Sequence, residues 1–266
     1  MPRPENPDFV DAIERGLAVI LAFRVDRPAL SLSEVAAATG LARPTARRVL
    51  VTLQALGYVR GEDRLYRLTP RVLDLGCAYV ASMGLWDVAR PHLRDLVAQT
   101  RESSSMSQLD GREIVYVGRV AVPKIVTIAV SVGTRFPAVA TSMGRVLLAD
   151  LPAEQLQAAL AAPPRGGVTP RVTPDPRYLG EVLAETRARG WALADQELAP
   201  GIRSVAAPIR NGRGRTVAAI NICVQAAEYS IDELAGKFLP LLLDAASAIG
   251  ADLARSERVA EVAVPS

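Results

Sequence analysis

The chain has 266 residues, which is enough for two domains with separate cores, and its net charge is only +3. Half of the residues are hydrophobic, yet no apolar run approaches the roughly 18 residues that a membrane-spanning helix requires. The N-terminus MPRPENPDFV has no apolar signal core, and the two cysteines, Cys77 and Cys223, lie far apart. We therefore expect a cytoplasmic protein with reduced thiols rather than a secreted, disulfide-bonded one.

The first expected element is a helix over residues 8–23, and it is followed by a short helix with clear end signals. Ser31 or Ser33 can cap the short helix, and Glu34 in its first turn complements the helix dipole. Gly40 stands where this helix must end with a positive φ angle. These signals predict the first half of a helix-turn-helix.

A second helix is expected to open at Arg43 with the sequence RPTARR, since proline is tolerated in a first helical turn. Its apolar residues recur at spacings of three and four, so this face should pack inward: Val49, Leu50, Leu53 and Leu56. A hairpin should follow, with two β-prone runs and a polar turn between them, at residues 58–60, 65–68 and 61–64. The whole pattern predicts a winged helix-turn-helix domain over residues 8–69.

Arginine is concentrated in this segment. Between residues 40 and 71, seven arginines minus two acids leave a local charge of +5. Arginine suits bidentate contacts to phosphate or guanine better than lysine does. The residues expected to contact DNA are Arg43, Pro44, Thr45, Arg47, Arg48, Arg60 and Arg64. The alternative is a winged domain that serves protein contacts and leaves its arginines solvated.

The remainder of the chain is expected to form a linker helix over residues 70–84 and a second domain over residues 85–255. Its first helix should lie at 86–101, bent or divided by Pro91. The other expected segments are hairpins at 105–120 and 202–224, a strand or extended run at 124–130, helices at 140–148, 153–160, 178–189 and 231–253, and a surface loop at 161–176. Antiparallel strands covered by long helices predict an α+β, sensor-like domain.

An enzyme is the competing hypothesis, and the sequence offers it little support. His92 is the only histidine, and beside Pro91 on a helix such a residue is usually at the surface or in helix packing. No Cys/His cluster has metal-ligand spacing, and no GxSxG, P-loop or dinucleotide-binding motif is present. Asp195 and Glu197 form a candidate carboxylate pair, but no nucleophile or base stands near them. We therefore predict no metal, no cofactor and no catalytic activity.

Several sequence blocks, in order, resemble the IclR family of bacterial transcription regulators. In the first half these are RGLAVILAF, LSEVAAATGLARPTARRVLVTLQALGYV and RLTPRVLDLG; in the second, VGTRFPAVATSMGRVLLADLP and GWALADQELAPGIRSVAAPIRNGRGRTVAAINICV. The resemblance implies a regulator that binds double-stranded operator DNA and carries a GAF-like effector-binding domain. The apolar faces of the first helix and the linker predict a homodimer, and the resemblance implies that two dimers can pair again.

Within that family, RFPAVATSMGRVLLA and LTPRVLDLGCAYVAS are most similar to regulators of aromatic-acid catabolism, in the protocatechuate, 4-hydroxybenzoate and β-ketoadipate pathways. An aromatic carboxylic acid is therefore the expected effector. The alternative effector is a non-aromatic metabolite, such as a short keto acid or a dicarboxylic acid.

The resemblance also implies the effector-binding residues: Ile125, Ile128, Ala129, Phe136, Ser142, Met143, Ala194, Asp195, Ile202, Ser204, Asn221 and Cys223. Ser142 should lie at a helix start, where free backbone N–H groups can receive a carboxylate. Arg135 could balance its charge or face solvent. Ser204, Asn221 and Ala194 replace a cysteine, a serine and an acid that are frequent in the family, which favours an aromatic ligand. The opposing interpretation is that several of these residues are ordinary core.

Overall fold

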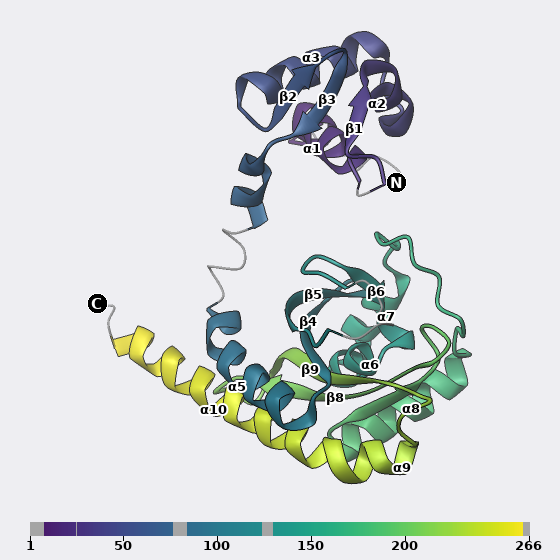
Figure 1. The fold of residues 1–266 in the computed structure, drawn as a ribbon, viewed down its shortest axis with the longest axis vertical. Helices are drawn as coiled ribbons and strands as arrows, with labels where there is room; N and C mark the ends of the chain where they lie inside the picture. The colour runs from purple at the N-terminus through teal and green to yellow at the C-terminus, as the bar shows by residue number, and fades with distance from the viewer. Residues whose placement is uncertain (1–7, 25, 77–83, 124–129, 263–266) are drawn as a thin grey trace. The chain divides into compact units, whose positions relative to one another are not determined.

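The computed structural model describes residues 8–24, 26–76, 84–123 and 130–262, with side chains up to residue 256. The chain divides into two compact units, Met1–Ser82 and Met83–Ser266, which are considered separately (Figure 1). The expected linker helix begins as a 3₁₀ turn at Pro70–Val72 and continues as helix to residue 76. Its remainder, including Cys77, lies outside the described residues, so the linker helix and the domain boundaries stay predictions.

The N-terminal unit is a winged helix-turn-helix domain. Its elements are α1 (Asp11–Ala22), β1 (Ala29–Ser31), α2 (Leu32–Thr39), α3 (Arg43–Ala55), β2 (Val59–Glu62) and β3 (Leu65–Leu68). The strands are antiparallel in the order β1-β3-β2. Ser31 and Glu34 form a reciprocal capping box at the start of α2, and Gly40 ends that helix with φ at 68°. Val19, Val35 and Leu50 join the three helices in one core.

Some details of this unit differ from the prediction. The first helix begins at Asp11, not at residue 8. Leu56 lies past the end of α3 and is 51% exposed, while Ala46 is buried on the inward face. Strand β2 reaches Glu62, so the tight turn contains only Asp63 and Arg64, both with positive φ. Strand β1 was not predicted, because three residues are too few to show alternation.

The C-terminal unit is a six-stranded antiparallel sheet between two layers of helices (Figure 1). In the order β6-β5-β4-β9-β8-β7, the strands are Arg135–Pro137, Glu113–Val120, Ser103–Asp110, Thr216–Gln225, Ile202–Arg210 and Ala192–Asp195. The helices are α5 (Leu85–Thr100), α6 (Ser142–Ala149), α7 (Ala153–Ala161), α8 (Pro176–Arg189), α9 (Ile231–Glu233) and α10 (Leu239–Val262), with a π turn at Leu234–Phe238. The α+β fold class is thereby confirmed, although β6 and β7 were missed, and α5 runs unbroken through Pro91.

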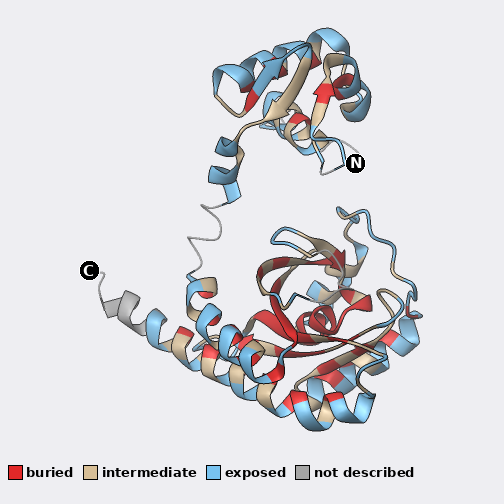
Figure 2. Ribbon diagram, in the orientation of Figure 1, coloured by how far each residue is buried: buried red, intermediate tan, exposed pale blue. Residues whose placement is uncertain are grey.

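Alternating residues of the central strands face different helices. Val205 and Ile220 pack against α5 and α10, whereas Ala206 and Ala219 face α6. Buried residues accordingly fill both sides of the sheet (Figure 2). The face toward α6 carries mostly small or polar residues in β8 and β9, such as Ser204, Ala206, Ala219 and Asn221, and this leaves room for a cavity.

The last helical segment differs from the sequence expectation in one respect. Residues Ile231–Ser256 are long and apolar enough, by length and composition alone, to cross a membrane. In the structure, however, Leu234, Phe238, Leu242 and Ile249 of this segment are fully buried in the core against the sheet. The segment is packed as a core helix of the C-terminal unit.

Candidate functional site

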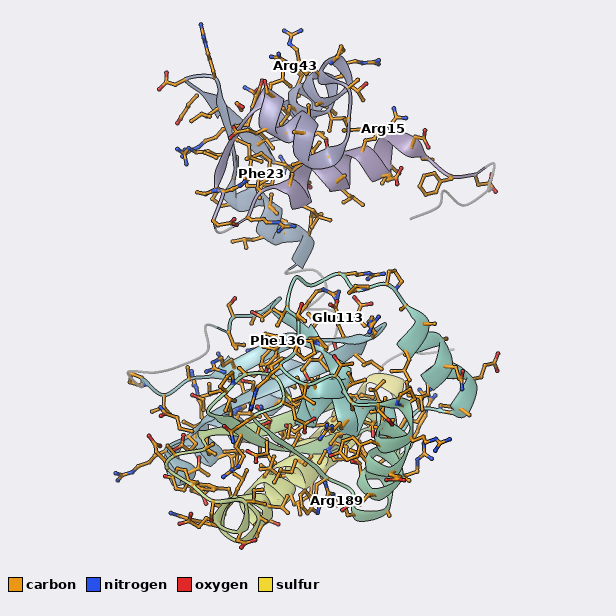
Figure 3. The ribbon with its side chains drawn as sticks, turned by 90° about the vertical axis from the view of Figure 1, so that its right-hand side faces the viewer. Arg15, Phe23, Arg43, Glu113, Phe136 and Arg189 are labelled. Carbon is orange, nitrogen blue, oxygen red and sulfur yellow. The ribbon has the colours of Figure 1, made fainter. Side chains whose placement is uncertain are left out.

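The N-terminal unit presents a basic face along α3. Arg43, Arg47 and Arg48 are exposed on the first turns of this helix, with Pro44 among them, and the side chain of Arg43 lies at the surface (Figure 3). Thr45 is half-buried. A shallow groove runs beside the helix and is lined by Leu32, Arg43, Pro44, Arg47, Arg48, Val51 and Thr52. A groove of this kind, with cations at a helix start, suits a nucleic-acid backbone and base edges.

The wing adds two further cations. Arg60 on β2 and Arg64 in the tight turn are both exposed. Within the part of the chain that the structure describes, no carboxylate pairs with Arg43, Arg47, Arg48, Arg60 or Arg64. Arg71, by contrast, lies over the Tyr58 ring, with its guanidinium carbon 5.4 Å from the ring centroid. The predicted DNA-contacting arginines are therefore available for an external anion.

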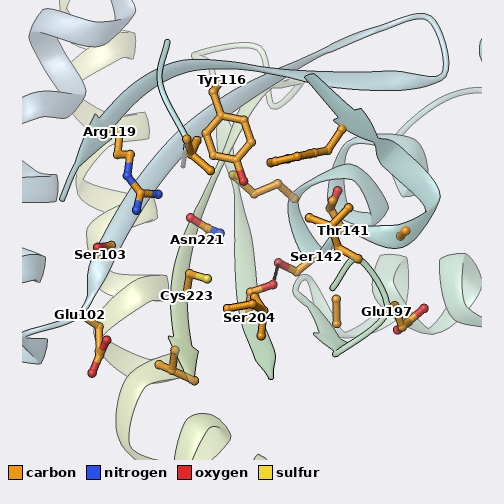
Figure 4. A pocket seen from close by; sticks show the side chains of 18 of the residues that line it. Glu102, Ser103, Tyr116, Arg119, Thr141, Ser142, Glu197, Ser204, Asn221 and Cys223 are labelled. Carbon is orange, nitrogen blue, oxygen red and sulfur yellow. Dashed lines mark hydrogen bonds between the residues drawn. The ribbon is translucent and has the colours of Figure 1, made fainter. Parts of the chain in front are cut away.

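The C-terminal unit contains a cavity on the α6 face of the sheet (Figure 4). Its empty space is about 810 Å³, a figure that includes the solvent at its open mouth. The described residues that line it are Glu102, Ser103, Tyr116, Arg119, Val130, Phe136, Ala140, Thr141, Ser142, Met143, Ala194, Glu197, Leu198, Ile202, Ser204, Asn221, Cys223, Val224 and Gln225. Strands β5, β7, β8 and β9 thus meet helix α6 around one space.

Most of the residues assigned from the resemblance lie on this wall: Phe136, Ser142, Met143, Ala194, Ile202, Ser204, Asn221 and Cys223. Asp195 does not, because it follows Ala194 in β7 and points to the other face, where it pairs with Arg203 at 2.8 Å. Arg135 is also not among the lining residues, since it pairs with Asp110 and Glu113. Ile125, Ile128 and Ala129 lie outside the described residues.

Aromatic side chains from two strands form one wall. The rings of Tyr116 and Phe136 meet edge to face, with centroids 5.6 Å apart and an interplanar angle of 88°. Burial raises the pKa of the Tyr116 phenol above its ordinary value, so the hydroxyl stays neutral at physiological pH. That hydroxyl makes no hydrogen bond with the described residues, and Figure 4 shows it directed into the cavity.

Polar groups converge from the other walls. The Ser142 and Ser204 hydroxyls lie 2.8 Å apart and hydrogen-bond each other. The Asn221 Oδ1 atom accepts a hydrogen bond from the Ser105 backbone N–H at 3.1 Å, which leaves its Nδ2 donor for the cavity. Arg119 donates from Nη1 to the Ser105 hydroxyl at 3.1 Å. The site is therefore apolar in part, with a few oriented donors.

The start of α6 is less open than the sequence suggested. Thr141 caps the helix, and its hydroxyl accepts a hydrogen bond from the Gly144 backbone N–H at 3.1 Å. Only the backbone N–H groups that precede Gly144 in the first turn are left without a hydrogen bond to this hydroxyl. The expected carboxylate site at Ser142 thus has fewer free donors than a bare helix start offers.

A buried arginine holds the wall behind the cavity. Arg145 is 2% exposed, donates to the carbonyl oxygens of Val139 and Leu193 at 3.1 and 2.9 Å, and pairs with Glu197. The two candidate catalytic carboxylates therefore each have an arginine partner, Arg145 for Glu197 and Arg203 for Asp195. They form no acid–base pair.

The single histidine serves helix packing. His92 Nε2 lies 2.8 Å from an Asp252 carboxylate oxygen, which joins α5 to α10. This hydrogen bond lowers the pKa of the Asp252 carboxyl. Among the described residues, no group of three His, Cys, Asp or Glu side chains could hold a metal ion.

A winged DNA-binding domain joined in one chain to a domain with a cavity walled by aromatic and polar side chains is the architecture of a ligand-responsive transcription regulator. Residues 12–63 match the IclR helix-turn-helix domain, and residues 77–251 match the bacterial transcriptional regulator IclR C-terminal domain. The chain belongs to the IclR family of bacterial transcription regulators, which are not enzymes.

Individual relatives agree with this assignment. The Pca regulon regulatory protein of Pseudomonas putida is 39% identical over 90% of this chain and 83% of its own length. The p-hydroxybenzoate hydroxylase transcriptional activator of Acinetobacter baylyi is 35% identical over 90% of each chain. A crystal structure of an IclR homolog complexed with 4-hydroxybenzoate, from Microbacterium hydrocarbonoxydans, is 28% identical, with a TM-score of 0.78 over 91% of this chain and 98% of that one.

Proposed function

We propose that this regulator senses a small aromatic carboxylic acid in the C-terminal cavity and controls a catabolic operon. The observation that carries the proposal is the cavity itself, where the Tyr116 and Phe136 rings face a wall with Ser142, Ser204 and Asn221. Aromatic walls bury a ring, and the few polar groups fix its orientation. The relative complexed with 4-hydroxybenzoate supports 4-hydroxybenzoate as the first candidate. Protocatechuate is the other aromatic candidate, and β-ketoadipate, which has no ring, stands behind both.

A short keto acid or a dicarboxylic acid is the second candidate effector. Such a ligand has no ring to pack against the side chains of Tyr116 and Phe136, whose own rings meet edge to face. The structure therefore favours the aromatic ligand.

Isothermal titration calorimetry with 4-hydroxybenzoate tests the site. Ser142→Leu and Asn221→Leu should each remove measurable binding, because leucine fills the cavity and deletes a polar partner. The exposed Ser247 on α10 provides the control, since Ser247→Leu makes the same kind of change outside the cavity. Normal binding by both cavity variants would show that the ligand binds elsewhere.

The partners we propose are double-stranded operator DNA and a second copy of the chain, in the cytoplasm. Helix α1 exposes a stripe of apolar side chains at a spacing of four, with Ile13 62%, Leu17 50% and Leu21 74% exposed. Leu73 and Leu75, in the described part of the predicted linker helix, are also exposed, at 66% and 50%. One copy cannot bury these faces, and operators are usually bound by symmetric pairs of winged modules. A dimer of dimers through the sensor domains remains part of the proposal.

Charge on the α1 stripe should break the dimer. Leu17→Asp combined with Leu21→Asp is expected to give monomers in light scattering, because two carboxylates would be buried without partners. The affinity of this double variant for operator DNA should fall as well. Val51→Asp, on the exposed face of α3, should keep the dimer mass. An unchanged mass in the double variant would exclude α1 as the dimer interface.

A further inference from the structure

Arg119 is the only basic side chain among the described residues of the cavity wall. It is half-buried on β5 and makes no ion pair with a described carboxylate. Of the two acids on the wall, Glu197 is paired with Arg145, and Glu102 is buried and has polar interactions of its own. A partly desolvated cation inside a ligand cavity is stabilised by an anionic partner, which a ligand can supply.

The donors around Arg119 are oriented before any ligand arrives. Ser105 is fully buried, and its hydroxyl accepts from Arg119 Nη1 while its backbone N–H donates to Asn221 Oδ1, each at 3.1 Å. The shared contacts place the guanidinium and the Asn221 amide at the same end of the cavity (Figure 4). Because Oδ1 is occupied by an N–H donor, the Asn221 Nδ2 group is the one that faces the space.

We infer that Arg119 and Asn221, oriented by Ser105, form a clamp for the carboxylate of the effector. The inference rests on the proposed function and adds to it the end of the cavity at which the carboxylate of the ligand binds. The guanidinium supplies charge and two-pronged geometry, and the amide supplies a second donor. Ser105 is a positioning residue, since it acts through the other two. This arrangement differs from the sequence expectation, which set the carboxylate at the start of α6, where Thr141 already holds one amide.

At the opposite end of the cavity the charged lining residue is Glu197, which is already paired with Arg145 (Figure 4). The Ser142 and Ser204 hydroxyls bond each other, which leaves one donor and acceptor positions for a neutral polar group. The hydroxyl of a hydroxybenzoate fits such a pair. A dicarboxylate would bring its second charge to this end, where the charged lining residue is an acid and no unpaired cation is found among the described residues. The clamp therefore selects aromatic acids with one carboxylate and a neutral polar group across the ring.

Calorimetry with two matched ligands tests the clamp on the full-length protein. 4-Hydroxybenzoate and 4-hydroxybenzamide have the same shape, but only the acid is charged. The wild type should prefer the acid about 10- to 100-fold, the effect expected for a charge-assisted hydrogen bond. Arg119→Met should abolish that preference through loss of acid affinity, with the amide affinity little changed. Arg119→Lys should keep part of the preference, and Ser105→Ala should reduce it.

Arg112→Met is the matched control, because Arg112 is exposed and is not part of the cavity wall. It should bind both ligands as the wild type does. Equal weakening of acid and amide by Arg119→Met, or a retained preference, would overturn the clamp while leaving the proposed effector class intact. A wild type that binds neither compound nor any other aromatic acid would instead refute the proposed function and the clamp with it.

Discussion

Replacing Arg47 and Arg48 together with alanine is expected to abolish specific operator binding while the protein stays folded. Both side chains are exposed on the groove beside α3, and neither has an acidic partner among the described residues. The double substitution therefore removes no ion pair between described residues, and the folded state should keep its stability. Each base-directed arginine that is lost should cost about 1–3 kcal/mol of discrimination, so the pair accounts for most of the preference for operator over random DNA.

Fluorescence anisotropy with operator and scrambled duplexes, at several salt concentrations, measures this effect. Arg64→Ala in the wing should weaken binding to both duplexes alike and flatten the salt dependence, since a phosphate contact carries no sequence information. Arg112 is an exposed arginine of the other unit, so Arg112→Ala should change neither the affinity for the two duplexes nor its salt dependence. Wild-type operator affinity in the Arg47, Arg48 and Arg64 variants would contradict the assignment of this winged domain as a DNA-binding module.

Gly144→Ala is expected to destabilise the C-terminal unit and to remove effector binding. A Cβ atom at this position would lie 2.1 Å from the backbone oxygen of Ala138 and 2.3 Å from its Cα. Backbone atoms cannot swing aside as a side chain can, so α6 must move off the segment beneath it. Overpacking of this kind costs typically about 1–3 kcal/mol, and Ser142 and Met143 would move with the helix.

The chain offers a control for the same substitution. Gly180 is exposed in α8, and a Cβ atom there would meet nothing within 4 Å. Gly180→Ala should therefore stabilise the unit by up to about 1 kcal/mol through helix propensity. Both tryptophans, Trp86 and Trp191, belong to this unit, so their fluorescence during urea unfolding reports on its stability. Equal unfolding midpoints for the two variants would contradict the close contact at Gly144.

The sequence by itself determined the DNA-binding half of this protein. The capping box at Ser31, the left-handed end of α2 at Gly40 and the proline in the first turn of α3 are local signals. Each acts within a few residues of its own position, so it can be recognised without knowledge of the rest of the fold. The family resemblance was equally secure, because its motifs follow one another in order along the chain.

The sequence could also indicate part of the cavity wall. A spacing of two places Ile202 with Ser204, and Asn221 with Cys223, on one face of a strand, and both pairs line the cavity. The same alternation shows that Asp195 does not line the cavity, once the strand around Ala194 is known. No strand is predicted at Ala192–Asp195 from the sequence, because four residues beside a loop show too little alternation.

Only the tertiary structure decided which cation belongs to the cavity. Arg119 stands three residues after Tyr116, and regular alternation would send the two side chains to opposite faces of β5. The pairing of β4 with β5 shifts between Met106 and Ser107, so that Tyr116 lies opposite Ser107 and Arg119 opposite Ser105. This bulge inserts an extra residue and returns Arg119 to the face of Tyr116. Arg135, which the sequence placed beside the pocket, is paired with acids from the adjacent hairpin. Register between strands depends on contacts distant in sequence, and local periodicity therefore cannot predict it.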